Sequence, residues 1–411
     1  MIKTFRSKRR FCLPLQNAEG KHLVQSEDKT QLLDSFFTNI FHAPTDNLPK
    51  LTDSDITLHN PITPQEVGIA ISKLNNGRAP GPDGLPNELI KIASSPQLNT
   101  TIAEMFNTNS WGEYLGQGEV IPLPKQKKRI PDNIRPIVLL NSTRKVLSII
   151  ILERTRPVVE QFIRPEQCGF RHKRGTADAV WAHRMIVSKA LKYNTKFHIL
   201  GLDMSKAFDT VNRSKLLEVL SSFLDSDSII LIRMLMENTT NRIRLENTLG
   251  ENIQVTHGVP QGDSLSPVLF TIYLEAVLQD LEEELIKRGF DIEIIHYILY
   301  ADDTDFISLD ETLIRQLEAI SQTVFTKWCL KVNPLKTEHT VVSKTQTEWH
   351  KTRKLGSLLK ESEDFCKQKQ AAEIVFNQLW FLWKKNNNLP EKLRLRLYKT
   401  LVRPVLLYNM N

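Results

Sequence analysis

Three aspartates stand where the chain could assemble a metal-dependent phosphoryl-transfer site. Asp203 follows the apolar segment Ile199-Leu-Gly-Leu, and Asp302 and Asp303 stand side by side after a second apolar segment. Adjacent carboxylates raise each other's pKa and oppose folding unless a cation neutralises them. Oxygen ligands suit Mg²⁺, and two such ions about 3.5–4 Å apart stabilise the attacking and leaving oxygens of an in-line displacement. The acids therefore favour two-metal phosphoryl transfer.

Each acidic position also has an ordinary structural interpretation. Asp203 could cap the helix that follows it, because Asp is a preferred residue at helix N-termini. Asp302 and Asp303 could form a hydrophilic hairpin turn, where Asp is common. The two features in one chain favour the metal site over two separate coincidences.

The elements that must position these acids can be predicted from hydrophobic periodicity. A strand at 197–203 delivers Asp203, and residues 292–309 form two strands with the acidic turn between them. Thr63-Pro-Gln-Glu66 predicts a capped helix running to about Leu74. The other expected helices are 29–41, 143–155, 212–224, 227–237, 265–288, 311–328 and two within 363–408, and the other strands are 120–123, 134–140 and a pair within 241–256.

Composition restricts the class of protein. The 411 residues are 41% hydrophobic and 25% charged, with a net charge of +7, which is ordinary for a globular protein and inclines toward polyanionic partners. The four cysteines are widely spaced, and the N-terminus lacks the apolar core of a secretory signal. No apolar run approaches the roughly 20 residues that span a bilayer. We therefore expect an intracellular protein of the nucleus or cytoplasm, not secreted and without a membrane partner.

Eight motifs, in order along residues 60–408, resemble the reverse transcriptase domain of non-LTR (LINE-like) retrotransposons. The Tyr300-Ala-Asp302-Asp303 box and the segment from Leu202 to Val211, which contains Asp203, carry most of this resemblance. The other motifs are Gly81–Pro86, Arg135–Leu140, Gln167–Arg171, Gly258–Pro267, Asn333–Glu338 and Lys354–Leu358. A single tetrapeptide is weak evidence, but the ordered set is specific.

The resemblance implies an α+β fold shaped as a right hand, with fingers, a palm built on an antiparallel sheet, and a helical thumb. Residues 1–60 would be a polar N-terminal region and 61–196 the fingers. The reverse transcriptase domain would span 104–358 with its palm core at 197–358. Residues 359–411 would be a truncated thumb, because the chain stops directly after an apolar run.

The resemblance also assigns catalytic and metal-binding residues. Asp203, Asp302 and Asp303 would hold two Mg²⁺ ions, for which Mn²⁺ could substitute, and the Met204 carbonyl would help to coordinate one of them. Lys336 could protonate the departing pyrophosphate as a general acid. An exposed lysine with no such role is the equal alternative. Asp305 is not expected to be a ligand.

Four further residues are expected at the nucleotide. Lys125 and Arg135 would cradle the triphosphate, since a guanidinium suits bidentate phosphate recognition. The ring of Phe208 would leave no room for a ribose 2′-hydroxyl and so favour deoxynucleotides. Gln261, in a glycine-flanked loop, would contact nucleotide or template. The alternatives are solvated charges for the two cations, a core Phe and a plain loop Gln.

The main hypothesis is therefore an RNA-directed DNA polymerase of a retroelement, a nucleotidyltransferase acting on an RNA template, a DNA primer and dNTPs. Basic residues concentrate in 118–156 and again in 384–404, where they could follow nucleic-acid phosphates. The alternatives are a non-catalytic RNA-binding remnant and a group II intron-type reverse transcriptase or maturase. The residues give no indication of oligomeric state.

Overall fold

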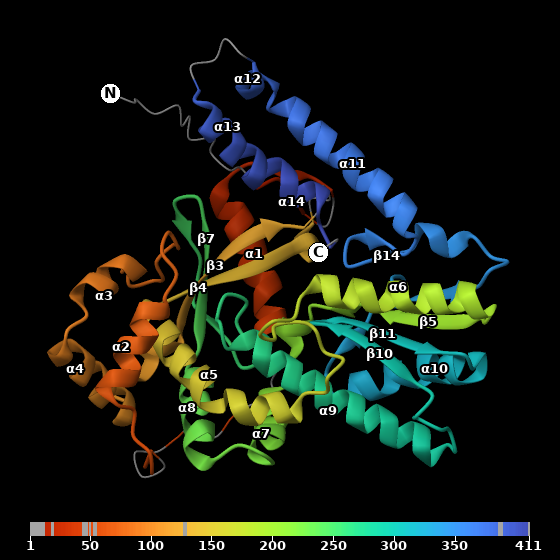
Figure 1. The fold of residues 1–411 in the computed structure, drawn as a ribbon. Helices are drawn as coiled ribbons and strands as arrows, with labels where there is room; N and C mark the ends of the chain where they lie inside the picture. Colours follow the sequence, from red (N-terminus) through yellow and green to blue (C-terminus); the bar gives the residue numbers. More distant parts are fainter. Residues whose placement is uncertain are drawn as a thin grey trace. The chain divides into compact units, whose positions relative to one another are not determined.

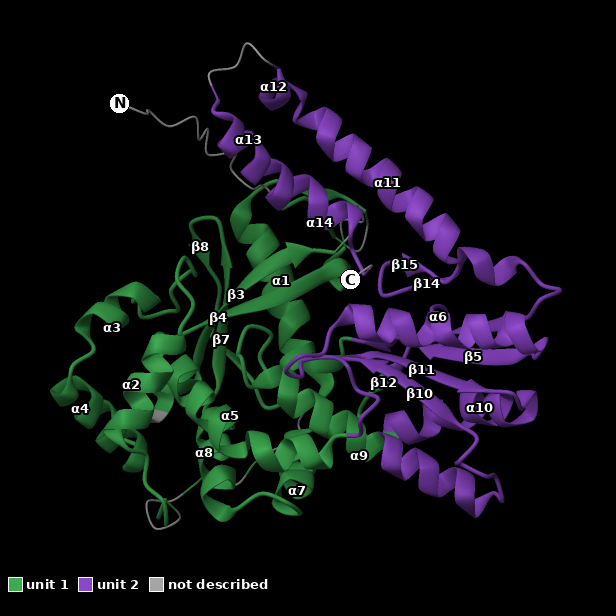
Figure 2. Ribbon diagram, viewed as in Figure 1, with its two compact units in different colours: residues 1–163, 206–277, 327–331 green, residues 164–205, 278–326, 332–411 purple. Residues whose placement is uncertain are grey.

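The computed structural model describes residues 13–17, 20–42, 48, 51, 56–125, 130–384 and 389–409. Its elements follow the chain as drawn in Figure 1. They form two compact units (Figure 2). Unit 1 comprises residues 1–163, 206–277 and 327–331, and unit 2 comprises 164–205, 278–326 and 332–411. Helices combine with mainly antiparallel sheets, as the predicted α+β class requires.

Unit 1 contains a five-stranded sheet in the order β4-β3-β7-β8, with β9 also paired to β7. Its strands are β3 (Gln117–Pro124), β4 (Ile134–Leu140), β7 (Thr240–Leu245), β8 (Thr248–Leu249) and β9 (Ile253–Gln254). Helix α1 (Ser26–Phe41) packs on this sheet through apolar side chains, among them Leu33 and Phe37. The strands expected at 120–123 and 134–140 are confirmed, and the helix expected at 29–41 begins at Ser26.

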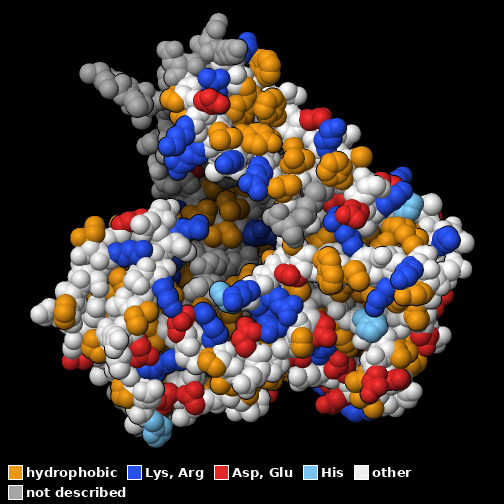
Figure 3. Space-filling model, viewed as in Figure 1, with side chains coloured by type: hydrophobic (Ala, Val, Ile, Leu, Met, Phe, Trp, Pro, Cys, Tyr) orange, Lys and Arg blue, Asp and Glu red, His pale blue; other side chains and the backbone are white. Residues whose placement is uncertain are grey.

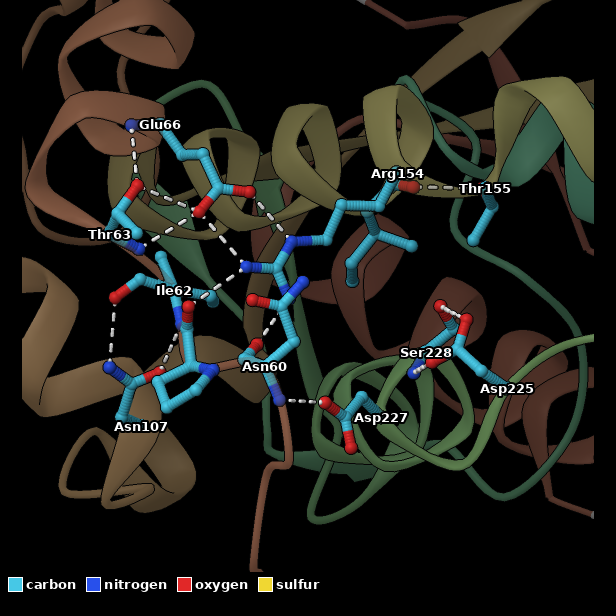
Figure 4. A network of polar contacts seen from close by, with 12 residues as sticks. Asn60, Ile62, Thr63, Glu66, Asn107, Arg154, Thr155, Asp225, Asp227 and Ser228 are labelled. Carbon is cyan, nitrogen blue, oxygen red and sulfur yellow. Dashed lines mark hydrogen bonds and ion pairs between the residues drawn. The ribbon is translucent and has the colours of Figure 1, made fainter.

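The predicted capping box of helix α2 (Pro64–Lys73) is confirmed. The Thr63 hydroxyl accepts from the Glu66 amide, and the Glu66 carboxylate accepts from the Thr63 amide. Arg154 donates to both oxygens of that carboxylate, at 2.7 and 2.9 Å, and to the Asn60 carbonyl at 2.8 Å (Figure 4). The Asp227 carboxylate accepts from the Asn60 amide. The entry to α2 is thus held by side chains from two other helices.

The remaining helices of unit 1 include two that sequence periodicity did not predict, α3 (Asn87–Ala93) and α4 (Pro96–Asn107). Helix α5 (Ser142–Phe162) runs past the expected end at 155, through Pro157. Proline removes one helical hydrogen bond, but Val159 and Ile163 beyond it are buried and hold the extra turns against the core. Helices α7 (Arg213–Ser221) and α8 (Ser226–Met236) confirm the two helices expected there.

Unit 2 contains a four-stranded antiparallel sheet in the order β10-β11-β5-β13. The strands are β5 (Phe197–Leu202), β10 (His296–Tyr300), β11 (Asp303–Ser308) and β13 (Glu338–Val342). Its core includes Ile199 and Ile307, with Ala190 and Val187 from helix α6 (Thr176–Tyr193), which was not predicted. The strand expected at 197–203 and the two strands within 292–309 are confirmed.

Residues 353–409 of unit 2 form a small hairpin followed by helices. The hairpin is β14 (Arg353–Lys354) and β15 (Ser357–Leu358). Helices α11 (Glu361–Gln378) and α12 (Trp380–Trp383) precede a continuous helical stretch made of α13 (Glu391–Leu397), a π-helical turn (Tyr398–Val402) and α14 (Arg403–Leu406). This is close to the two helices expected within 363–408. Figure 3 shows basic and hydrophobic side chains gathered over these helices.

The elements that remain are helices α9 (Ser266–Lys287) and α10 (Glu311–Lys327), which confirm two predictions, and short pieces. The short pieces are β1 (Leu15–Gln16), β2 (His22–Leu23), β6 (Met204–Ser205), β12 (Lys331–Val332) and four 3₁₀ turns at 112–116, 131–133, 207–210 and 348–351. Within the described part of the chain, no helix combines the length and the apolar character needed to cross a membrane.

Candidate active site

The three predicted carboxylates lie at one end of the unit 2 sheet. Strands β5 and β11 are neighbours, and Leu202 pairs with Thr304. Asp203 leaves the end of β5 directly after this pair, and Asp303 opens β11 directly before it. Asp302 precedes Asp303 in the turn from β10. The register therefore brings together three acids that the sequence separates by about a hundred residues.

Electrostatic repulsion within this group is visible at Asp303. The residue is exposed, but protein atoms crowd one side of its carboxylate. Desolvation, followed by repulsion from the nearby carboxylates of Asp302, Asp305 and Asp203, raises the pKa of Asp303 to about 6. The Lys354 ammonium acts in the opposite direction. Such a group of acids is stabilised by positive charge.

Lys336 supplies one such charge. Its ammonium lies 3.0 Å from Asp203 Oδ2, although the lysine side chain is 61% exposed. The Asn333 amide donates to the Asp203 carbonyl at 2.8 Å, which fixes the loop carrying Lys336 beside β5. The structure thus places the proposed general acid next to a proposed metal ligand.

The turn bearing Asp302 is held by a residue to which sequence reasoning gave no role. Gln167 Oε1 accepts from the Ala301 amide at 3.1 Å and from the Gly169 amide at 2.7 Å. Ala301 has φ +57°, an unfavourable angle for a residue with a side chain. A Cβ at Gly169 would lie 2.3 Å from the Ala301 nitrogen, so the close approach requires glycine. The only signal for this role was the Gln167-Cys-Gly motif.

The donor set fits a hard divalent cation. Carboxylate oxygens are the ligands that Mg²⁺ prefers, and the repulsion that raises the pKa of Asp303 would be relieved by a bound cation. Among the residues that the structure describes, no three His, Cys, Asp or Glu side chains are gathered into a preformed metal site. In this structure the ammonium of Lys336 supplies the positive charge beside Asp203.

The four predicted nucleotide-binding residues belong to unit 1. Gln261 Nε2 donates to both carboxylate oxygens of Asp209, at 2.9 and 3.1 Å. Burial raises the pKa of Asp209, and it remains at about 6 although the Gln261 bond and the nearby Lys125 and Lys206 lower it. Lys125 and Gln261 are therefore brought close to one carboxylate. Residues 126–129 of the adjoining basic loop lie outside the described residues.

Phe208 and Arg135 have other surroundings in the described contacts. Phe208 lies on the 3₁₀ turn Ala207–Thr210 and stacks on Phe270 with ring centroids 4.8 Å apart. It is half-buried, so part of the ring remains accessible. Arg135 is exposed on β4, paired in register with Leu123. Asp209, next to Phe208 in the chain, accepts from the Gln261 side chain.

Asp305, which was not expected to be a ligand, lies in a buried ion pair. The carboxylate is buried and contacts Lys354 Nζ at 2.5 Å and His183 Nε2 at 2.9 Å. Desolvation acts to raise the pKa of Asp305, but Lys354 and His183 together lower it below its ordinary value. Strand alternation puts Asp305 on the same face as Asp303, but no sequence pattern pointed to His183 or Lys354 as its partners.

Comparison with known proteins shows the family of this chain. The profile of the family "Reverse transcriptase (RNA-dependent DNA polymerase)" matches residues 123–370, more than half of the chain. The RNA-directed DNA polymerase from the mobile element jockey of Drosophila funebris is 25% identical over 96% of this chain and 47% of that protein. A probable RNA-directed DNA polymerase from transposon X-element of Drosophila melanogaster is 31% identical over 56% of this chain and 26% of that protein. An apo telomerase structure from Candida tropicalis aligns with 65% of this chain and 59% of that chain, at 16% identity and a TM-score of 0.45.

The chain spans about half the length of the jockey relative and a smaller share of the X-element relative. The matched segment contains Asp203, Asp302 and Asp303 together with the Lys336 loop. By this match the chain belongs to the reverse transcriptase (RNA-dependent DNA polymerase) family of nucleotidyltransferases, and its relatives are the polymerases of non-LTR retrotransposons.

Proposed function

We propose that this chain adds deoxynucleotides to the 3′-hydroxyl of a primer along an RNA template. The observation that supports the proposal best is the meeting of Asp203, Asp302 and Asp303 at one end of the β5–β11 pair. Family membership supports the same reaction class. The chain would thus act as the polymerase of a retroelement.

The carboxylates would hold divalent cations. When bound, two Mg²⁺ ions would supply positive charge at the attacking and leaving oxygens of the phosphoryl transfer. Asp203, Asp302 and Asp303 would provide the carboxylate ligands, with the Met204 carbonyl as a further oxygen. Gln167 orients the turn that presents Asp302, because it bonds the backbone at Ala301.

Lys336 would move a proton to the leaving group. Its ammonium is now paired with Asp203, at 3.0 Å. A cation bound to Asp203 would compete for that carboxylate, so that Lys336 could turn toward a departing pyrophosphate and protonate it. Lys336 is 61% exposed and therefore has room to do so.

The incoming nucleotide would be read by unit 1 residues. Lys125 and Arg135 would bind the triphosphate, and Phe208 would exclude a 2′-hydroxyl. The two hydrogen bonds to Asp209 fix the Gln261 side chain, which would contact the nucleotide or template through its remaining carbonyl oxygen. Residues 61–196 would be fingers, the sheet β10-β11-β5-β13 the centre of the palm, and residues 359–411 a thumb.

Primer extension tests the proposal directly. Purified chain should incorporate dTTP on poly(rA)–oligo(dT) in the presence of Mg²⁺, and Asp302→Ala should reduce the rate by about a hundredfold or more, because it removes a ligand of the reacting centre. Asp291→Ala is the matched control, since Asp291 is exposed and bonds only the Glu293 amide among the contacts described.

Each result has a defined meaning. If Asp302→Ala extends primers at the wild-type rate, the proposed role of the carboxylates in the reaction is wrong. Tight binding of primer–template by the wild type with no incorporation would instead identify a non-catalytic nucleic-acid-binding remnant.

A further inference from the structure

The β14–β15 hairpin is joined to the catalytic sheet by a buried ion pair. Lys354 Nζ lies 2.5 Å from Asp305 Oδ1, and the two side chains are 11% and 9% exposed. The second carboxylate oxygen contacts His183 Nε2 at 2.9 Å, and His183 Nδ1 lies 2.8 Å from the Ala179 carbonyl. Buried charges require partners of this kind. Lys354 therefore has one well-defined place against the sheet.

A glycine in the central strand makes room for this pair. Gly201 of β5 pairs in register with Asp305 of β11. A Cβ on Gly201 would lie 2.5 Å from Lys354 Nζ and 2.7 Å from Asp305 Oδ1, so the ion pair fills the space of a side chain. Glycine weakens a strand interior and commonly marks the close approach of another group. The ion pair is that group.

The pair lies beside the catalytic carboxylates. Asp303 and Asp305 occupy alternate positions of β11 and so face the same side of the sheet, about 6.6–6.8 Å apart along the strand. A shift of Lys354 would thus act on Asp305, which is the next residue after Asp303 on this face of β11.

The turn of the same hairpin is bound by the C-terminal helical segment. Leu355 and Gly356 have φ values of +49° and +85°, as a two-residue hairpin turn requires. The Leu355 carbonyl accepts from Tyr408 Oη and Asn409 Nδ2, both at 3.2 Å. Lys367 of α11 donates to the Gly356 carbonyl at 2.8 Å. The hairpin therefore contacts both the catalytic sheet and the helices that follow it.

A second attachment joins the hairpin to α11. The Leu358 amide donates to the buried carboxylate of Asp364 at 2.8 Å, and Arg184 of α6 donates to the other oxygen of Asp364 at 2.8 Å. Lys354 joins this assembly of hairpin and helices to strand β11.

We propose that Lys354 is a positioning residue of the polymerase site: its ion pair with Asp305, in the space left by Gly201, fixes the hairpin and the attached C-terminal helices relative to the catalytic carboxylates. The inference rests on the proposed function and deepens it. Because Lys354 acts through Asp305 and the hairpin, its loss reduces turnover more than primer–template binding.

Two variants separate positioning from stability. Lys354→Met keeps the length of the side chain but leaves Asp305 buried without its cation, which lowers the unfolding midpoint by roughly 5–10 °C. The double variant Lys354→Met with Asp305→Asn removes both charges, and its midpoint returns to within about 2 °C of the wild type. Lys360→Met is the matched control, since Lys360 pairs with Glu363 at 3.2 Å with side chains 37% and 40% exposed.

Kinetics below the unfolding transition then decide. We expect kcat to fall about tenfold or more in both the single and the double variant, since small misplacements are costly. Primer–template Kd changes by less than about threefold, and the control is unchanged. A kcat that recovers with the midpoint in the double variant, or a wild-type kcat in Lys354→Met, overturns the inference.

Hydrogen exchange tests the anchor without relying on activity. Amides of residues 352–359 should exchange about tenfold faster or more in the double variant, while those of β11 stay as in the wild type. Unchanged exchange in the hairpin overturns the inference. A wild-type chain that fails to extend primers would contradict the proposed function alone, and exchange would still report on the anchor.

Discussion

Burial controls the charge of Asp209 more strongly than its hydrogen bonds do. The residue is 5% exposed, and its pKa is raised to about 6 although Gln261 donates two hydrogen bonds to it. Lys125 and Lys206 offset only part of the desolvation. The Asp209 carboxylate is therefore harder to ionise in the native state than in the unfolded chain. The same carboxylate holds the Gln261 side chain in place.

Stability should therefore depend on pH through Asp209. Its folded pKa, about 6, lies above the unfolded value of 3.8, so its contribution is present below pH 3.8 and lost as pH rises through 6. Asp209→Asn removes this loss. We expect the variant to exceed wild type by about 1–3 kcal/mol at pH 8 and to match it at about pH 4, in urea unfolding. An equal difference at both values of pH would contradict this charge assignment.

Phe208 gives a second test at the residue scale. Its ring stacks on Phe270 and is half-buried, which suits either a packing residue or a wall beneath a sugar. Phe208→Ala removes that wall, so the preference for dTTP over UTP, measured as a ratio of kcat/KM, should fall about tenfold or more. An unchanged ratio accompanied by lower stability would identify Phe208 as a packing residue only.

At the scale of elements, Arg154 joins helix α5 to the start of α2. Its guanidinium holds the Glu66 carboxylate with two donors and also caps the Asn60 and Pro61 carbonyls, with side-chain exposures of 15% and 31% for Arg154 and Glu66. A half-buried, bidentate pair of this kind is stronger than one in open solvent. The capping box of α2 therefore depends on a residue remote in sequence.

Removal of Arg154 should destabilise the protein measurably. Arg154→Met should cost about 2–4 kcal/mol in urea unfolding, because it leaves Glu66 without its cation and removes a donor from two carbonyls. Arg156→Met is the control in the same helix, since Arg156 pairs with Glu153 with exposures of 53% and 40%. It should cost less than about 0.5 kcal/mol. Equal losses of unfolding free energy in the two variants would show that the bonds of Arg154 between the helices add no stability.

At the scale of the whole molecule, charge distribution matters more than the net +7. Lys392, Arg396, Lys399 and Arg403 are all exposed and recur at helical spacing along the last helical stretch. Positive charges in such a row release counterions when they bind a phosphate backbone. The stripe is the basic face that the sequence indicated in 384–404.

Salt dependence tests this stripe. Changing Lys392, Arg396 and Lys399 to Gln should weaken poly(rA)–oligo(dT) binding and reduce the slope of log K against log salt by about 2–3. The control changes Lys287, Arg288 and Arg315 to Gln, which alters net charge equally; these three pair with Glu at helical spacing. A control with the same slope as the stripe variant would reduce the effect to net charge.

Local rules determined much of the fold. Alternation and apolar runs predicted β5, β10 and β11, and capping chemistry predicted the start of α2, because these signals act within a few residues. The positions of the three aspartates next to strand ends could be predicted for the same reason. Helices α3, α4 and α6 were missed, and α5 ran past Pro157 because buried contacts beyond it outweigh a broken hydrogen bond.

The tertiary structure alone decided which distant residues meet. In the sequence, Gly201 is an ordinary strand residue, and only the fold shows that Lys354 and Asp305 fill the space that a side chain there would need. Likewise, only the fold shows that the Gln167 side chain bonds the Ala301 amide. Desolvation likewise follows from packing, so the pKa values of Asp209 and Asp303 arise only in the folded chain. Contacts between residues more than a hundred positions apart produce no periodic pattern in a sequence. The reason is that their energy depends on where the whole fold places the two residues.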